Sequence, residues 1–539
     1  MVGRDFAGTE VGGPLLPQAQ LEIFKNLFRS IAEEMGVVLQ RSAYSPNIKE
    51  RLDFSCALFD PSGELVAQAA HIPVHLGSMP AAVKAAADSF PELEEGDVVL
   101  LNDPYRGGTH LPDITAVTPA YFQGRLVGYV ANRAHHADVG GAFPGSMGLA
   151  RDVFQEGIRI PPVRLYRRGA LQRDVMELLL ANVRVPEERR GDLEAQVAAN
   201  RRGAARLTEL AAKYGPETAE AWMRELLDYT ERMTRALIAS LPRGSYTFAD
   251  CIEDDGLGSG PLPIRVRVDL LGDRAVVDFT GTAPQTAGPL NCPKAVTVSA
   301  VAYVFRCLTD PETPANAGAF RAFEVVVPEG TLLHARPPAP VAGGNVETSQ
   351  RVVDVVLGAL AQAAPGRIPA ASCGTMNNVV VGGYDPRRGS AFTYYETLGG
   401  GMGAHARGPG LSAVQTHMTN TKNTPVEALE HAYPLRVRRY CIRTGSGGRG
   451  AYSGGDGLVR ALEALVPCKA ALLTERRITR PYGLAGGEPG TPGENLLWPA
   501  GAQAPISLPG KVEVELNPGD ILEIRTPGGG GYGRAAERP

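Results

Sequence analysis

Three of the nine histidines in the sequence lie in two loops that one predicted hairpin joins. His110 lies in the run NDPYRGGTHLPD, which ends at Asp113, and His135 and His136 lie in the run NRAHHAD. The strands that flank the two loops can lie side by side, so His110, Asp113 and His135 can meet at one sheet edge. Two imidazoles and a carboxylate are a common ligand set for a divalent ion such as Zn, Mn or Fe.

Asp53, at the start of an earlier strand, is a fourth candidate ligand. The ion would polarise a carbonyl group or lower the pKa of a bound water. His136 and Asp138 are candidates for orienting a ligand or moving a proton, because adjacent residues of an extended strand point to opposite faces and His136 then points away from the ion. The alternative is that these histidines only bond to loop backbone.

His71 and His75 precede a short predicted helix, where a purely structural role is the favoured interpretation.

Two glycine-rich segments, Gly445–Gly450 and Gly454–Gly457, invite a phosphate-binding interpretation. Neither fits the pattern G-x-x-x-x-G-K-[ST], and no lysine follows them. Tight turns in a strand-rich region are the favoured account, so a nucleotide site, if the reaction uses ATP, is expected elsewhere. A serine hydrolase is disfavoured, because no Gly-x-Ser-x-Gly elbow stands between a strand and a helix.

Three further polar loops are candidates for lining a substrate pocket. The first holds Asn345 and Glu347 just before a predicted helix, whose N-terminal amides could bind an anion. Simple capping of that helix by Thr348 or Ser349 is the alternative. The second loop ends at His405, and the third spans His417–Thr424. Asn345, Glu347 and His405 are the predicted substrate-binding residues, with a plain structural role as the alternative for each loop.

Composition excludes several classes of partner. The net charge is −4, and a nucleic-acid or membrane-surface partner would favour a basic face instead. No signal peptide and no stretch of about 18 apolar residues is evident, so we expect a cytoplasmic location. The seven cysteines form no C-x-x-C pair, which disfavours a disulfide framework or a thiolate zinc site.

The sequence predicts a mixed α and β, multi-domain chain with strand-rich lobes and an inserted helical region around residues 174–241. Glycines and prolines separate short apolar stretches outside that region, which is typical of strands joined by tight turns. Helices are expected at 15–43, 80–89, 294–308 and 349–363, and hairpins at 54–68 and 114–132. The predicted domains are a metal-site domain at 1–242, a central α+β domain at 243–365 and a β-rich domain at 366–539.

Five longer runs carry a family resemblance: RSAYSPNIKERLDFS from Arg41, NDPYRGGTHLPD, NRAHHADVGG, GGNVETSQR from Gly343, and SGGDG from Ser453. They resemble the hydantoinase B family, and the resemblance extends from about Leu15 to Gly533. That family includes subunits of N-methylhydantoinase, caprolactamase and ketone carboxylases, and the C-terminal half of 5-oxoprolinase.

The resemblance implies a subunit that carries a divalent metal, Zn or Mn or else Fe, on Asp53, His110, Asp113 and His135. It also implies a partner, the A-type subunit, that binds ATP and Mg, in a hetero-oligomer such as a heterotetramer. The implied reaction is ATP-dependent opening of a small cyclic amide. The alternatives are a subunit of an ATP-dependent ketone carboxylase, for which 539 residues is short, and a non-catalytic, metal-stabilised scaffold.

Overall fold

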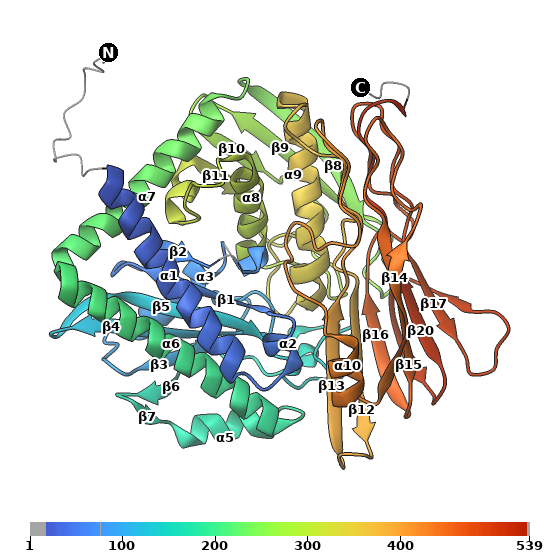
Figure 1. Cartoon of the computed structure of the whole chain (residues 1–539), viewed down its shortest axis with the longest axis horizontal. Coiled ribbons are helices and arrows are strands. Elements are labelled where there is room, and N and C mark those ends of the chain that lie inside the picture. The colour runs from blue at the N-terminus through green and yellow to red at the C-terminus, as the bar shows by residue number, and fades with distance from the viewer. Residues whose placement is uncertain (1–17, 70, 76, 536–539) are drawn as a thin grey trace.

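A computed structural model describes residues 18–69, 71–75 and 77–535 of the chain (Figure 1). It is built from four β-sheets with helices packed among them, which confirms the predicted mixed, strand-rich architecture. No helix in these ranges combines the length and the apolar composition that a membrane crossing needs.

The N-terminal part is a seven-stranded antiparallel sheet. Its strands, in spatial order, are β2 (Leu65–Gln68), β1 (Phe54–Phe59), β5 (Arg125–His135), β4 (Asp113–Phe122), β3 (Val98–Leu101), β6 (Val163–Arg167) and β7 (Ala170–Leu171). The predicted hairpins are present, since β1 pairs with β2 and β4 pairs with β5.

Helices cover one face of this sheet, and the main core of the protein lies against the other (Figure 1). Leu58 and Val130 belong to the cluster formed with α1 (Gln18–Ser42) and α6 (Pro186–Tyr214), whereas their neighbours Ala57 and Ala131 belong to the main core. Both sets are apolar because the sheet is buried on both sides, so the strands show no polar alternation. The shorter helices around this sheet are α2 (Pro46–Lys49), α3 (Met79–Ser89), α4 (Val153–Glu156) and α5 (Arg173–Ala181).

After α7 (Pro216–Ala239), the chain forms a four-stranded sheet covered by two helices. The strands are β8 (Gly244–Ile252), β9 (Leu262–Leu270), β10 (Ala275–Asp278) and β11 (Phe323–Val326), and the helices are α8 (Lys294–Leu308) and α9 (Ser349–Ala363). Both helices have the predicted bounds. Short 3-10 turns lie at η1 (Pro73–His75) and η2 (Ala317–Ala322).

The start of α9 differs from the prediction. A π-helical turn, η3 (Gly344–Thr348), runs directly into α9, and Thr348 has helical backbone angles and caps nothing. Its hydroxyl donates to the carbonyl of Leu290, and the Ser349 hydroxyl donates to Asn345. Capping by Thr348 or Ser349 was therefore the wrong expectation, because the helical path begins one turn earlier.

The C-terminal part pairs two antiparallel sheets around a third core, in the orange-to-red region of Figure 1. One sheet is β13 (Ser390–Thr397), β12 (Asn378–Asp385), β16 (Cys468–Leu473) and β19 (Lys511–Leu516). The other is β14 (Leu435–Arg443), β15 (Gly457–Ala464), β20 (Ile521–Arg525), β17 (Glu494–Trp498) and β18 (Ile506–Leu508), with α10 (Val426–Ala432) beside it.

The main hydrophobic core is continuous across residues 242 and 366, the two predicted domain boundaries. Its members include Tyr129 of β5, Val356 of α9 and Val380 of β12. The division into three domains stays a prediction, and the packing joins all three predicted parts through one core.

The glycine-rich segments form a layer in which backbone packs directly on backbone. Gly448 donates its N–H to the Gly529 carbonyl, and Gly529 donates to Gly455. A Cβ on Gly454 would meet the Gly529 carbonyl, and one on Gly529 would meet the Met402 carbonyl. Within the two predicted turn segments only Gly445 has a left-handed φ, of 82°. Most of these glycines therefore allow close approach of extended chains, and the interpretation as tight turns was wrong for them.

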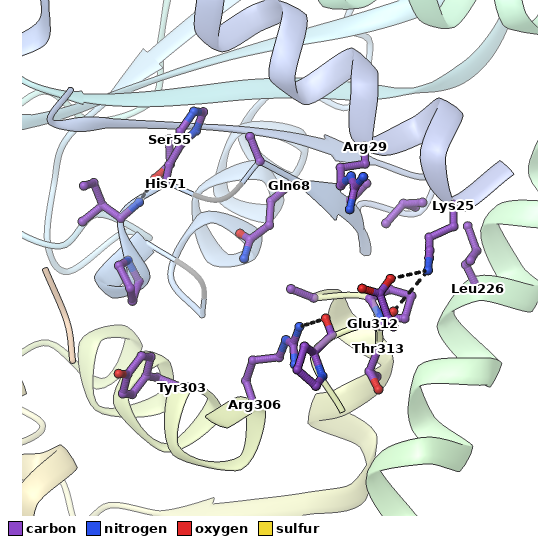
Figure 2. Close-up of a pocket in the computed structure, with 18 of the residues that line it drawn as sticks. Lys25, Arg29, Ser55, Gln68, His71, Leu226, Tyr303, Arg306, Glu312 and Thr313 are labelled. Carbon is purple, nitrogen blue, oxygen red and sulfur yellow. Dashed lines mark hydrogen bonds and ion pairs between the residues drawn. The ribbon is translucent and has the colours of Figure 1, made fainter. Parts of the chain in front are cut away.

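A cavity of about 430 Å³ opens between the N-terminal layer and α8 (Figure 2). Lys25 and Arg29 of α1 approach it from one side, and Tyr303 and Arg306 of α8 from the other.

We predict that Gly529→Ala destabilises the fold. The new methyl group overlaps the Met402 backbone, which cannot swing aside as a side chain can, so we expect a loss of about 1–3 kcal/mol in the free energy of unfolding. Urea denaturation followed by circular dichroism measures the change. The control is Gly260→Ala, whose methyl group meets no atom within 4 Å. Equal effects of the two substitutions would contradict the packing argument.

Candidate metal centre

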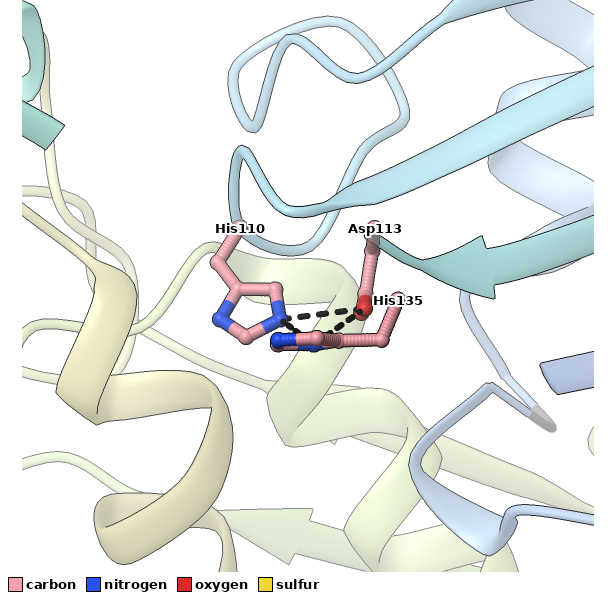
Figure 3. A group of neighbouring side chains, drawn as sticks. All are labelled: His110, Asp113 and His135. Carbon is pink, nitrogen blue, oxygen red and sulfur yellow. Dashed lines mark hydrogen bonds and ion pairs between the residues drawn. The ribbon is translucent and has the colours of Figure 1, made fainter. Parts of the chain in front are cut away.

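Three ligand atoms form a nearly equilateral triangle at the end of the β4–β5 hairpin (Figure 3). His110 Nε2 lies 3.0 Å from Asp113 Oδ1, and His135 Nδ1 lies 3.2 Å from the same oxygen. The two ring nitrogens are 3.2 Å apart. Ligand atoms bound at about 2.0–2.2 Å to one ion lie roughly 2.8–3.6 Å apart at tetrahedral or octahedral angles. The triangle thus has the size that a single divalent ion requires.

Strand pairing positions two of these residues directly. Asp113 begins β4, His135 ends β5, and the two are partners in the antiparallel register. His110 lies in the loop before β4, and Asn102 fixes that loop at both ends. The Asn102 side chain donates to the Leu111 carbonyl at 2.7 Å and accepts the Ile160 N–H at 2.6 Å.

The second oxygen of Asp113 is held by other polar groups. Thr109 donates its hydroxyl to Oδ2 at 2.6 Å, the Asn345 amide lies 3.4 Å away, and His75 Nε2 also lies 3.4 Å away. Oδ1 is therefore the oxygen that faces the imidazoles. Burial alone would raise the pKa of Asp113, but the neighbouring His110, His135 and His75 hold it well below its usual value.

Each imidazole is also oriented from outside the triangle. His110 Nδ1 lies 3.2 Å from the Ala342 carbonyl; donation of Nδ1–H to that oxygen leaves the Nε2 lone pair free. The His135 ring stacks on Tyr395, with ring centres 4.5 Å apart, and its Nε2 is buried without a partner. Burial lowers the pKa of His135, which favours the neutral ring that binds metals.

Asp53, the fourth predicted ligand, borders the same site. A small cavity of about 20 Å³ is lined by Asp53, Asp113, His135 and Asn345, among others. The Asp53 carboxylate lies 3.7 Å from Arg51 Nη1 and outside the compact triangle. The volume is enough for about one water-sized group. These donors, two nitrogens and two carboxylates, fit a divalent ion of the zinc or manganese type.

His136 and Asp138 point to other surroundings. His136 Nε2 lies 2.9 Å from Gln196 Oε1 on α6. The Asp138 carboxylate accepts the backbone N–H groups of Gly140 and Gly145 and pairs with Arg184 at 2.9 Å. Both residues are fully buried. Their predicted role in catalysis or orientation stays a prediction, and the contacts connect them to α6 and to the loop after β5.

The three predicted substrate-binding residues lie in different places. Asn345 lines the small cavity beside Asp113. Glu347, two residues later on η3, accepts the Met376 N–H and the Asn378 amide. His405 lies on the wall of a separate cavity of about 500 Å³. The structure thus brings Asn345 alone of the three to the metal ligands.

His75 is the residue that sequence reasoning missed. Its Nδ1 lies 2.8 Å from the Ser55 hydroxyl, and its Nε2 faces Asp113. It reaches the site on η1, a 3-10 turn far from the β4–β5 hairpin in the sequence. The sequence signal was a histidine in a segment with few polar neighbours, which equally suits a structural histidine.

Comparison with known proteins agrees with this geometry. Residues 18–535 match the model of the Hydantoinase B/oxoprolinase family. The chain belongs to this family. It is 42% identical to 5-oxoprolinase 1 of Arabidopsis thaliana over 95% of the chain and 42% of that protein. It is 33% identical to a Pseudomonas protein named as the B-type component of a D-/L-hydantoinase, over 96% of the chain and 90% of that protein.

Among solved structures, the ATP-dependent caprolactamase of Pseudomonas jessenii has the same fold, with a TM-score of 0.91. It is 31% identical to this hydantoinase B family chain, and the match covers 97% of the chain and 92% of the caprolactamase chain. The chain spans about two fifths of the Arabidopsis 5-oxoprolinase. The predicted family membership is therefore confirmed.

We predict that a His110→Ala, His135→Ala double variant purifies without the divalent ion that the wild type binds. Two of the three triangle atoms are removed, so the remaining carboxylates cannot hold an ion tightly. Element analysis should give about one ion per wild-type chain. His136→Ala is the matched control, because its ring contacts Gln196 instead. An unchanged metal content in the double variant would refute the ligand assignment.

We predict a pH-dependent effect of Glu347→Gln on stability. Burial raises the pKa of Glu347 to about 8 from 4.5, so folding favours its protonated form. The wild type then loses stability as the pH rises from 4.5 through 8, by up to about 1.4 kcal/mol per pH unit, and the glutamine variant does not. Urea denaturation at several pH values in that window measures the difference. A difference as flat as that of the exposed Glu324→Gln variant would contradict the prediction.

Proposed function

We propose that this chain is the metal-binding subunit of an ATP-dependent cyclic amide hydrolase, and that it acts with an A-type, ATP-binding subunit in the cytoplasm. The triangle formed by His110, Asp113 and His135 carries the proposal, because it lies beside a small enclosed cavity in a chain of the hydantoinase B family. The hydrolases in the comparison, 5-oxoprolinase and caprolactamase, support the reaction class.

A divalent ion on Asp53, His110, Asp113 and His135 would polarise an amide carbonyl or lower the pKa of a bound water. The protein's own groups keep those ligands in place. Thr109, Asn345 and His75 hold Oδ2 of Asp113, and apolar residues line the rest of the cavity. A dry, rigid surround strengthens the electrostatic effect on the reacting group. The apolar lining residues are Ile72, Val74, Val346, Met376 and Met418.

The need for an ATP-binding partner follows from how the glycine-rich segments are used. A phosphate loop requires free backbone N–H groups. Gly448, Gly454 and Gly455 already donate theirs to carbonyls of neighbouring segments. The match to only 42% of the Arabidopsis 5-oxoprolinase leaves most of that protein without a counterpart here. We propose that a separate subunit supplies the ATP and Mg site, in a hetero-oligomer such as a heterotetramer.

His136 and Asp138 enter this proposal as positioning residues. The His136 contact with Gln196 ties the end of β5 to α6, and the Asp138 carboxylate organises the loop that follows. They support His135 from behind without reaching the ion.

The test is ATP hydrolysis by the chain co-expressed with its ATP-binding partner. We expect ring opening of 5-oxoproline, hydantoin or ε-caprolactam with ATP consumption in step, and no ATP hydrolysis by the isolated chain. Bicarbonate-dependent turnover of acetone instead would identify a ketone carboxylase. Full activity of a metal-free double variant at His110 and His135 would leave only a scaffold role. Tight nucleotide binding by the isolated chain, measured by calorimetry, would contradict the division of labour.

A further inference from the structure

Residues 417–421 form a wall between the metal cavity and a larger cavity of about 500 Å³. Met418 and Thr421 line the metal side, and His417 and Asn420 line the larger cavity. Thr419 lines both. The larger cavity lies among α8, α9 and the loops around residues 366–372 and 402–420. A ligand there would therefore lie one side chain away from the metal ligands.

The wall of the larger cavity carries three buried polar atoms without hydrogen-bond partners. They are Gln415 Oε1, His417 Nε2 and Thr419 Oγ1. The side chains of His417 and Thr419 belong to residues that are only 8% and 5% exposed. An unpaired buried polar group costs about 1–3 kcal/mol, so such a group is expected where a ligand completes its bonding.

The backbone of this wall is strained at the same place. His417 has a φ of 59°, in the left-handed region that residues other than glycine rarely adopt. Its Nε2 is 3.8 Å from Asp354 Oδ1, which is too far for a hydrogen bond. Burial lowers the pKa of His417 to about 4, so the ring is neutral at pH 7. Strain of this kind persists at sites that bind or react.

Apolar side chains form the rest of the larger cavity. Leu308, Leu357, Ile368 and Met402 line it together with Tyr303. A largely apolar cavity with a few convergent polar groups is the usual form of a small-molecule site.

The neighbouring cavity of about 430 Å³ differs in this respect. Lys25 pairs there with Glu312 at 3.6 Å, and Arg306 donates to the carbonyls of Asp310 and Pro311, some of which Figure 2 shows. Among its described lining residues, Thr313 Oγ1 is the one buried polar atom without a partner. Its polar groups are mostly satisfied without a ligand.

We propose that the 500 Å³ cavity binds the ring of the cyclic amide substrate, with Gln415 and Thr419 recognising its amide group. This inference rests on the proposed function. A ring amide presents an N–H donor and a C=O acceptor on the same side. Gln415 Oε1 accepts the ring N–H, Thr419 donates its hydroxyl to the carbonyl, and His417 Nε2 offers a further polar contact. Thr419 then holds the reacting carbonyl at the boundary with the metal cavity.

Two cysteines allow binding to be measured without turnover. Cys307 is exposed and lines the larger cavity, and Cys441 is exposed on β14 and does not line it. We expect 5-oxoproline, hydantoin or ε-caprolactam to slow iodoacetamide modification of Cys307, about tenfold at a concentration ten times Kd. Modification of Cys441 in the same sample should not change. Peptide mass spectrometry gives both rates in the complex with the ATP-binding subunit.

A pair of matched substitutions tests recognition. Thr419→Val in the complex should lower kcat/KM about 3–10-fold, mainly through KM, with the metal content unchanged. Thr313→Val is the control, because Thr313 is equally buried and unpartnered but lines the other cavity. It should leave kcat/KM at the wild-type value.

The outcomes separate this inference from the proposed function. Protection of Cys307 without turnover would keep the cavity assignment and remove the hydrolase assignment. Turnover without protection, and with equal kinetics for the two valine variants, would overturn the cavity assignment alone. Absence of both protection and turnover would overturn both. Loss of metal in Thr419→Val would place Thr419 in the metal centre and also overturn its role in recognition.

Discussion

The register of one strand pair, β4 with β5, determines where the chemistry of this protein lies. It sets Asp113 opposite His135, and a slip by one residue would turn one of these side chains to the opposite face of the sheet. Buried amides secure this register. Gln196 of α6 donates to the Ile114 carbonyl and to Asn132 Oδ1, so the helix holds both strands at once. The remaining groups of the centre approach a pair that is already fixed.

How far the sequence predicts this arrangement depends on how local each contact is. The periodicity of α8 and α9 and the hairpin between His110 and His135 were readable because their interactions lie within short segments. His75 was not, because η1 reaches Asp113 through tertiary packing. The same holds for the glycine-rich segments, since a glycine chosen for a turn and one chosen for close backbone contact look identical in sequence. Periodicity also could not reveal the π turn before α9, because it adds no residue pattern of its own.

That π turn joins the metal centre to the C-terminal sheets. Asn345 on η3 contacts Asp113, and Glu347, two residues later, accepts a hydrogen bond from Asn378 of β12. Asn378 in turn accepts the hydroxyl of Tyr395, whose ring stacks on His135. The path returns to the metal ligand from which it is two contacts removed. A displacement of β12 or β13 against η3 would therefore be felt by both Asp113 and His135.

The layer of glycine backbone has a consequence at the level of the gene. Every glycine codon begins with two guanines, so any single-base change at either of those positions replaces the residue. At Gly454, Gly455 and Gly529 even the smallest replacement would collide with a neighbouring carbonyl. Ordinary cores absorb errors by exchanging one apolar side chain for another, but this layer has no side chains to exchange. Random mutagenesis should therefore leave these codons nearly silent only at their third base.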